Sequence, residues 1–152
     1  TAERIPWGIA LLFGGGLSLA AAMQANGVTD WLAGQLDWIG AWGPFVVLLL
    51  IVALVIFLTE IASNTAVLTA LLPVVGALAE ATGQPPLQLA MGAALAASFA
   101  FMLPIGTPPN AIAYASGAVP IKRMIRVGFW LNLIGIAVVA GTVHLLAPVL
   151  LR

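Results

Sequence analysis

The chain has 152 residues, of which 62% are hydrophobic and 7% are charged, whereas a soluble domain carries about 25% charged residues. It contains no cysteine, so disulfides and thiolate metal sites are excluded, and its formal net charge of +0 argues against a nucleic-acid partner. The sequence therefore predicts an all-α integral membrane protein that is surrounded by lipid and has no resident cofactor.

The first two predicted elements precede residue 43. Residues 5–26 are expected to form a spanning helix, since roughly 20 apolar residues are enough to cross a bilayer. The run Gly14-Gly15-Gly16 suits close helix packing, or alternatively a bend that lines a cavity. Residues 27–42 combine acidic side chains with tryptophans at helical spacing, which is typical of a short amphipathic segment in the membrane interface.

Three small polar residues interrupt the next apolar run: Ser63, Asn64 and Thr65. Unpaired polar groups are unfavourable in hydrocarbon, so polar residues in the middle of such a run indicate a function or a break. All three are good N-cap residues, and we expect a new helix from near Thr65 to about Glu80. Residues 43–80 are therefore predicted to form a re-entrant helical hairpin. Two full spans joined by a polar turn fit the pattern as well, and Glu60 would then be a surface residue.

A second interruption lies in the uncharged stretch 81–121, which is too long for one span and too short for two spans with a loop. After a predicted helix over 87–103 comes the run Pro104-Ile105-Gly106-Thr107-Pro108-Pro109-Asn110. Gly106 can end a helix, and Thr107 followed by Pro108 is typical of an N-cap with proline in the first turn. Residues 87–117 are therefore predicted to be one discontinuous helix.

Residues 122–151 are predicted to form the final spanning helix. The start of this helix carries the cationic residues Lys122, Arg123 and Arg126. The positive-inside rule places these residues, and the loop that they belong to, in the cytoplasm. With a re-entrant hairpin, Arg152 is the one basic residue that falls outside, so the charges favour the hairpin slightly. His144 is expected to serve packing or the membrane interface rather than a proton relay. We expect a multi-pass protein of a bacterial inner membrane.

The two breaks have complementary chemistry. The start of a helix presents unpaired N–H groups and roughly half a positive charge, which favours an anion. The end of a helix presents unpaired carbonyls, which suit Na⁺. The helix starts at Asn64-Thr65 and Thr107-Pro108 could converge on one carboxylate, while carbonyls near 59–62 and 103–106 could hold sodium. Secondary transporters use this design near the bilayer midplane.

The motif Ser63-Asn64-Thr65, followed by the run from Pro104 to Ile112, resembles the divalent anion/sodium symporter family, the sodium-coupled dicarboxylate transporters. The resemblance covers nearly the whole chain and corresponds to the C-terminal half of such a transporter. It implies one inverted repeat of an elevator-type fold, a dicarboxylate substrate and Na⁺ as the coupling ion. It also implies an N-terminal half with a second Ser-Asn-Thr motif and its own sodium site, and assembly as a homodimer.

The same resemblance implies the binding residues. The residues that match positions contacting the substrate carboxylate are Ser63, Asn64, Thr65, Thr107 and Pro108. The residues that match a sodium site are Thr59, Ala62, Asn64 and Gly106, with Ala62 and Gly106 acting through their carbonyls. Because the other half of the site is absent from this sequence, the chain alone is not expected to transport. We expect it to be a piece of a longer polypeptide or a processed one.

Three functional hypotheses are compatible with the sequence. The first is sodium-coupled symport of C4-dicarboxylates such as succinate, malate and fumarate. The second is a related transporter of citrate, sulfate or another anion, or a sodium/proton exchanger. The third is a non-transporting membrane assembly subunit in which both polar breaks only pack helices. An enzyme is not expected, because the sequence shows no acid–base pair, no nucleophile–histidine pair and no metal cluster.

Overall fold

The computed structural model describes residues 14, 15, 18, 21–28, 31, 34 and 42–150. The predicted spanning helix over 5–26 and the predicted interfacial segment over 27–42 therefore lie largely outside the described residues. From residue 42 onward the chain is helical, as expected for an all-α protein. The helices there are α3 (Pro44–Thr59), α4 (Asn64–Ala81), α5 (Pro86–Ala96), α6 (Pro108–Ala115) and α7 (Ile121–Leu150).

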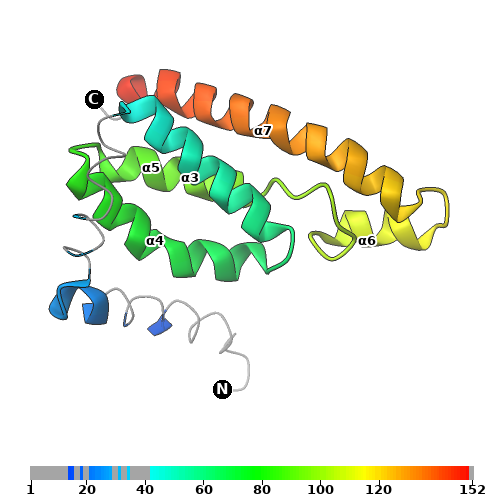
Figure 1. Cartoon of the computed structure of the whole chain (residues 1–152), viewed down its shortest axis with the longest axis horizontal. Coiled ribbons are helices and arrows are strands. Elements are labelled where there is room, and N and C mark those ends of the chain that lie inside the picture. Colours follow the sequence, from blue (N-terminus) through cyan, green and yellow to red (C-terminus); the bar gives the residue numbers. More distant parts are fainter. Residues whose placement is uncertain are drawn as a thin grey trace, which may run out of the picture.

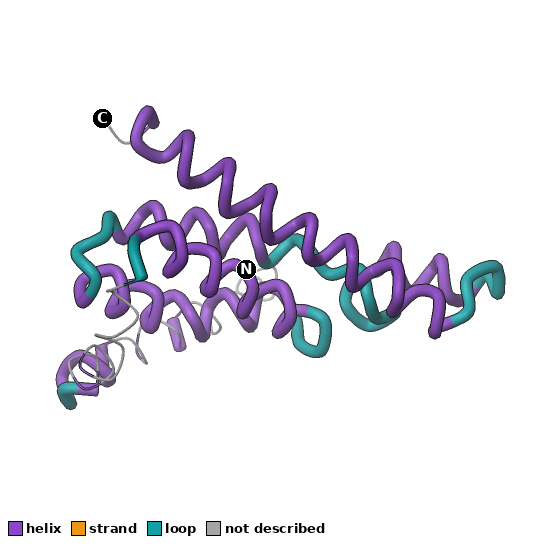
Figure 2. Tube along the Cα trace, turned by 45° about the horizontal axis from the view of Figure 1, so that its top comes forward, coloured by secondary structure: helices purple, strands orange, loops and turns teal. Residues whose placement is uncertain are grey.

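The helices α3, α4 and α5 form a compact group, and α7 lies along it (Figures 1 and 2). The helix α3 contacts α4, α5 and α7, while α5 contacts both α4 and α7. In Figure 1, α6 lies away from this group, beside the N-terminal part of α7. The polar turn between α3 and α4 and the segment before α6 lie next to each other in both views.

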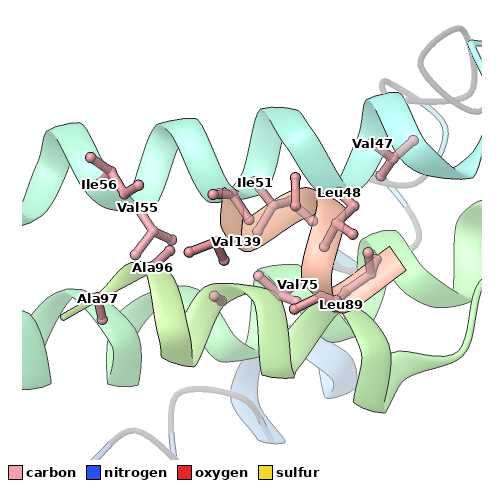
Figure 3. Close-up of a cluster of buried hydrophobic side chains, with 14 of the residues drawn as sticks. Val47, Leu48, Ile51, Val55, Ile56, Val75, Leu89, Ala96, Ala97 and Val139 are labelled. Atoms are coloured by element: carbon pink, nitrogen blue, oxygen red, sulfur yellow. The ribbon is translucent and has the colours of Figure 1, made fainter. Parts of the chain in front are cut away.

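The core lies where α3 faces α5 and α7 (Figure 3). Its largest fully buried apolar side chains are Leu48, Ile56, Leu89, Val47, Val52, Val55 and Val143. Alanine and glycine residues on α5 let α3 approach closely. At Gly92, for example, an added Cβ would lie 2.5 Å from Leu48 Cδ1. Close packing of these branched side chains against small residues sets the position of α3 relative to α5. It therefore also sets the positions of the turn after α3 and of the unwound segment after α5.

The first polar break is a short turn. The helix α3 ends at Thr59, and α4 begins at Asn64 and ends at Ala81, close to the predicted limits. Ser63 takes the N-cap position, and its carbonyl accepts the N–H of Val67 at 2.9 Å. The hairpin geometry by itself does not distinguish a re-entrant pair from two spans, so the topology of 43–80 stays a prediction.

The second break is longer than predicted. The helix α5 ends at Ala96, not at residue 103, and the chain is unwound over residues 97–107 before α6 begins at Pro108. The helix α6 ends at Ala115, and Gly117 follows with a φ of 74°, a conformation that favours glycine. The extra unwinding arises because side chains from elsewhere in the chain bind the backbone of this segment, as described below.

Two of the described helices are long and apolar enough to cross a membrane, α4 with 18 residues and α7 with 29 residues in its candidate span. The helices α3 and α5 are also apolar but shorter. Length and composition thus agree with the expected membrane protein. They leave the number of membrane crossings as a prediction.

Candidate site where the two breaks meet

The two interrupted segments line one pocket of about 690 Å³. Its wall combines the start of α4, the end of the unwound segment and one face of α6. The lining residues are Ser63, Asn64, Thr65, Pro104, Ile105, Gly106, Thr107, Pro108, Ala111 and Tyr114. All five residues predicted to contact a substrate carboxylate are in this set. Their role in binding stays a prediction, but their common location is a property of the fold.

The start of α4 supplies hydrogen-bond donors to this pocket. Ser63 precedes the helix in an extended conformation, with φ −57° and ψ 129°, and its hydroxyl forms no capping bond with the described residues. The first backbone N–H groups of a helix have no partner inside that helix. The Ser63 hydroxyl thus leaves the N–H groups at the start of α4 uncapped, and of the first helical residues Asn64 and Thr65 line the pocket.

The start of α6 is a weaker source of donors than the sequence suggested. Thr107 takes the N-cap position with φ −146° and ψ 153°, and its hydroxyl makes no capping bond within the described chain. However, Pro108 and Pro109 fill the first two helical positions, and proline has no N–H group. The donors that this end can offer are therefore the Thr107 hydroxyl and N–H and the N–H of Asn110.

The predicted sodium ligands divide into two groups. Asn64 and Gly106 line the pocket, and Asn64 Oδ1 is buried without a hydrogen-bond partner among the described residues. Thr59 and Ala62 are not among the residues that line it. Thr59 is fully buried, and its hydroxyl donates to the Ile56 carbonyl at 2.9 Å. The structure thus brings only half of the predicted sodium set into this pocket.

Sequence reasoning missed Glu60, which lies at the C-cap of α3 and is only 3% exposed. Its Oε1 accepts hydrogen bonds from the N–H groups of Phe101 at 2.7 Å and Met102 at 2.9 Å, and its Oε2 accepts from Met102 at 3.1 Å and Leu103 at 3.0 Å. Glu60 is therefore buried rather than a surface residue, whichever topology residues 43–80 adopt. The signal was visible in the sequence: a single carboxylate between two long apolar runs.

Asn132 on α7 completes the environment of Glu60. Asn132 is fully buried, and its Nδ2 donates to Glu60 Oε1 at 2.7 Å. On the same face of α7, an added Cβ at Gly128 would overlap the Phe101 carbonyl and lie 2.6 Å from Met102 Cα. At Gly135 it would lie 2.7 Å from the Phe99 ring. The unwound segment therefore rests directly on a strip of small and polar residues along α7.

Asn110 binds the same segment through the segment's backbone carbonyls. Its Nδ2 donates to the carbonyls of Ala100 at 2.8 Å and Leu103 at 3.1 Å. Glu60 thus accepts hydrogen bonds from the N–H groups of residues 101–103, and Asn110 donates hydrogen bonds to the carbonyls of residues 100 and 103. Buried backbone groups need partners wherever no helix provides them, so these two side chains explain how the chain stays unwound beyond Ala96.

The remaining sequence candidate is His144. Its ring packs against Phe45 in an edge-on arrangement with the centroids 5.1 Å apart. Its Nδ1 is buried and has no hydrogen-bond partner in the described part of the chain. The ring contact is consistent with the expected packing role.

Comparison with known proteins identifies the family. The chain matches the family model described as the sodium:sulfate symporter transmembrane region over residues 1–151. It is 48% identical over 147 residues to the sodium-dependent dicarboxylate transporter SdcS of Staphylococcus saprophyticus. It is also 45% identical over 150 residues to SdcS of Staphylococcus aureus strain MRSA252.

These alignments cover 97% and 99% of this chain but only 28% and 29% of the two relatives. The chain thus spans less than a third of the length of the curated relatives it matches. Membership of a transporter family confirms the expectation that the chain is not an enzyme, and it confirms the resemblance drawn from the two motifs. The chain belongs to the sodium:sulfate symporter family.

Proposed function

We propose that the chain forms part of a sodium-coupled symporter of C4-dicarboxylates such as succinate, malate and fumarate. The observation that carries this proposal is the pocket in which the start of α4 meets the loop before α6. Relatives named as sodium-dependent dicarboxylate transporters support the choice of substrate and coupling ion.

The proposed roles follow from the groups that face the pocket. One carboxylate of the substrate binds at the start of α4, where Ser63, Asn64 and Thr65 lie. The same carboxylate contacts the start of α6 at Thr107 and Pro108. No lysine or arginine is among the described residues that line the pocket. On this side of the site we propose that oriented N–H groups and sodium balance the negative charge of the substrate.

For sodium we propose Thr59, Ala62, Asn64 and Gly106 as ligands. The unpaired, buried Oδ1 of Asn64 is an oxygen of the type that Na⁺ binds. Gly106 offers its carbonyl in a close contact, since an added Cβ would lie 3.1 Å from Ala100 Cβ and would require a small shift of that neighbour. Thr59 uses its hydroxyl hydrogen in a bond to Ile56, which leaves the oxygen lone pairs for a cation. Ala62 is exposed and requires a rearrangement of the turn to reach the site.

The wider proposal concerns the complete transporter. The chain supplies half of the substrate site and one sodium site, and a separate N-terminal half supplies the rest. Residues 43–80 form a re-entrant hairpin, the loop with Lys122 and Arg126 faces the cytoplasm, and the transporter works as a homodimer in the inner membrane by an elevator motion. The short share of the relatives that the chain covers supports a site shared with other sequence.

A second candidate substrate class is an inorganic or larger anion, since the matching family is described as sodium:sulfate symporters. Sulfate and citrate would use the same helix start on α4. Competition for uptake distinguishes C4-dicarboxylates from these other anions. In proteoliposomes with an imposed sodium gradient, unlabelled succinate should suppress uptake of labelled succinate at concentrations where sulfate and citrate do not.

The test uses the complete transporter with Asn64→Ala or Thr107→Ala. Loss of a hydrogen bond to a charged group corresponds to about 1.5–3 kcal/mol, so we expect each variant to reduce sodium-driven succinate uptake at least about tenfold at low substrate. Matched controls are Asn26→Ala and Thr142→Ala, since both residues are exposed and outside the pocket lining. Undiminished uptake in both pocket variants would overturn the proposed function.

A further inference from the structure

The environment of Glu60 joins the two motifs through one side chain. Glu60 precedes Ser63 and Asn64 in the short turn between α3 and α4. Its carboxylate binds the N–H groups of Phe101, Met102 and Leu103, just ahead of Gly106. Its Oε2 lies 3.3 Å from where a Cβ of Gly106 would be. The carboxylate therefore connects the backbone on one side of the pocket to the backbone on the other.

Glu60 is absent from the pocket lining and is not among the proposed ligands. Both of its oxygens are already occupied by N–H donors from residues 101–103 and Asn132. No Lys, Arg or His nitrogen forms an ion pair with it among the described residues. Within the described chain, the carboxylate therefore accepts hydrogen bonds from backbone N–H groups and one side-chain amide. These donors require a side chain with two acceptor oxygens.

The residues around this contact are closely packed. Asn132 is fully buried on α7 and donates to Glu60 Oε1. The Gly128 position brings the α7 backbone against Phe101 and Met102, so the segment has no room to move toward α7. Asn110 holds the carbonyls of Ala100 and Leu103 at the same time. The position of Gly106 and Thr107 is therefore set by where Glu60 and Asn132 hold the preceding residues.

We infer that Glu60, supported by Asn132, is a positioning residue that sets the placement of Gly106–Pro108 relative to Asn64. This inference rests on the proposed function for the identity of the ligands. Because Asn64 and Gly106 belong to the proposed sodium set and Thr107 and Pro108 to the substrate set, displacement of the segment should weaken both ligands. A residue that only stabilised the fold would reduce the amount of folded transporter and leave affinities unchanged.

The experiment uses Glu60→Gln in the complete, purified transporter. An amide nitrogen in place of Oε2 would face the N–H groups of Met102 and Leu103 instead of accepting from them. On the monodisperse fraction we expect the half-saturating concentrations of both Na⁺ and succinate to rise at least fivefold. The matched control Glu80→Gln, on an exposed glutamate of α4, should leave both unchanged.

Asn132→Leu is the milder second variant, since it removes one amide donor and keeps the three backbone donors to Glu60. We expect a shift in the same direction for both ligands, smaller than that of Glu60→Gln. If Glu60→Gln does not fold, this variant decides. Unchanged half-saturation for both ligands in a folded variant would overturn the positioning role. Absence of sodium-driven succinate uptake in the wild type would instead refute the proposed function, so the two failures are distinguishable.

Discussion

Glu60 shows at the residue scale how this fold accommodates a buried charge. A carboxylate in an apolar interior is unfavourable unless donors surround it. Here three backbone N–H groups and the Asn132 amide donate to it, and hydrogen bonds to charged groups contribute about 1.5–3 kcal/mol each. The donors are available because residues 101–103 are not helical. The charge and the unwound segment therefore stabilise each other.

Gly128 provides a residue-scale test of the contact between α7 and the unwound segment. An alanine Cβ there would overlap the Phe101 carbonyl, and the obstacle is backbone rather than a flexible side chain. We expect Gly128→Ala to lower the thermal stability of the purified transporter, with a destabilisation of about 1–3 kcal/mol, as for other overpacked sites.

The matched control for Gly128 lies on the same helix. An added Cβ at Gly141 has no neighbour within 4 Å, so Gly141→Ala should be neutral or slightly stabilising, because alanine favours a helix over glycine. Equal thermal stability of the Gly128→Ala and Gly141→Ala variants would show that α7 and Phe101 are not in the close contact described above.

The sequence could supply some of these residues but not others. Ser63, Asn64 and Thr107 stand out because polar or helix-breaking residues interrupt apolar runs. The pairing of Glu60 could not be predicted, because its partners Phe101 and Asn132 are 41 and 72 positions away in the chain. Asn132 stands out as a lone polar residue in the final predicted span, but no local pattern links it or Phe101 to Glu60. Only the packing of α3, α5 and α7 brings them together.

At the element scale, the unwound segment shows tertiary contacts overriding local preference. Residues 97–100 include two alanines and no proline or glycine, so the sequence favours continuing α5 to residue 103. The helix nevertheless ends at Ala96. The bonds that Glu60 and Asn110 make to residues 100–103 replace helical hydrogen bonds. Proline and glycine in the run 104–109 explain the rest of the break.

The hairpin topology gives an element-scale prediction. Ala66 lies in the first turn of α4 and is exposed. If residues 43–80 are re-entrant, Ala66→Cys should react poorly with a membrane-impermeant thiol reagent from either side when sodium and succinate are bound. Ready labelling from the cytoplasm in that state would instead favour two full spans. The chain contributes no cysteine of its own to the background.

At the scale of the whole molecule, the described chain leaves its site open. No residue of α6 is buried by the described part of the chain, and large apolar side chains of the unwound segment and of α6 are exposed, Ile105 by 74% and Ile112 by 71%. A lone pocket of this kind would let water compete for every proposed contact. The proposal that other sequence of the transporter completes the site accounts for both observations.

The sequence predicted the fold class and the two breaks, because composition and hydropathy report directly on a lipid environment. It could not predict which of the expected ligand residues line the pocket. Pro108 and Pro109 weaken the α6 end as an anion site, and Thr59 and Ala62 lie outside the pocket lining. The first feature is local, because proline has no N–H group in any context, whereas the second depends on how the helices pack and cannot be seen in a local stretch of sequence.

The central claim is that both breaks form one ligand site, and cysteine protection tests it most directly. Ala66→Cys, exposed in the first turn of α4, and Ala111→Cys, which lines the pocket on α6, place single thiols at the two walls without removing a proposed ligand, and Ser116→Cys, at the far end of α6, is the control. We expect sodium with succinate to slow labelling of the first two at the same half-protecting concentration, and to leave the control unchanged. Protection of only one wall, or at clearly different succinate concentrations, would contradict a single shared site.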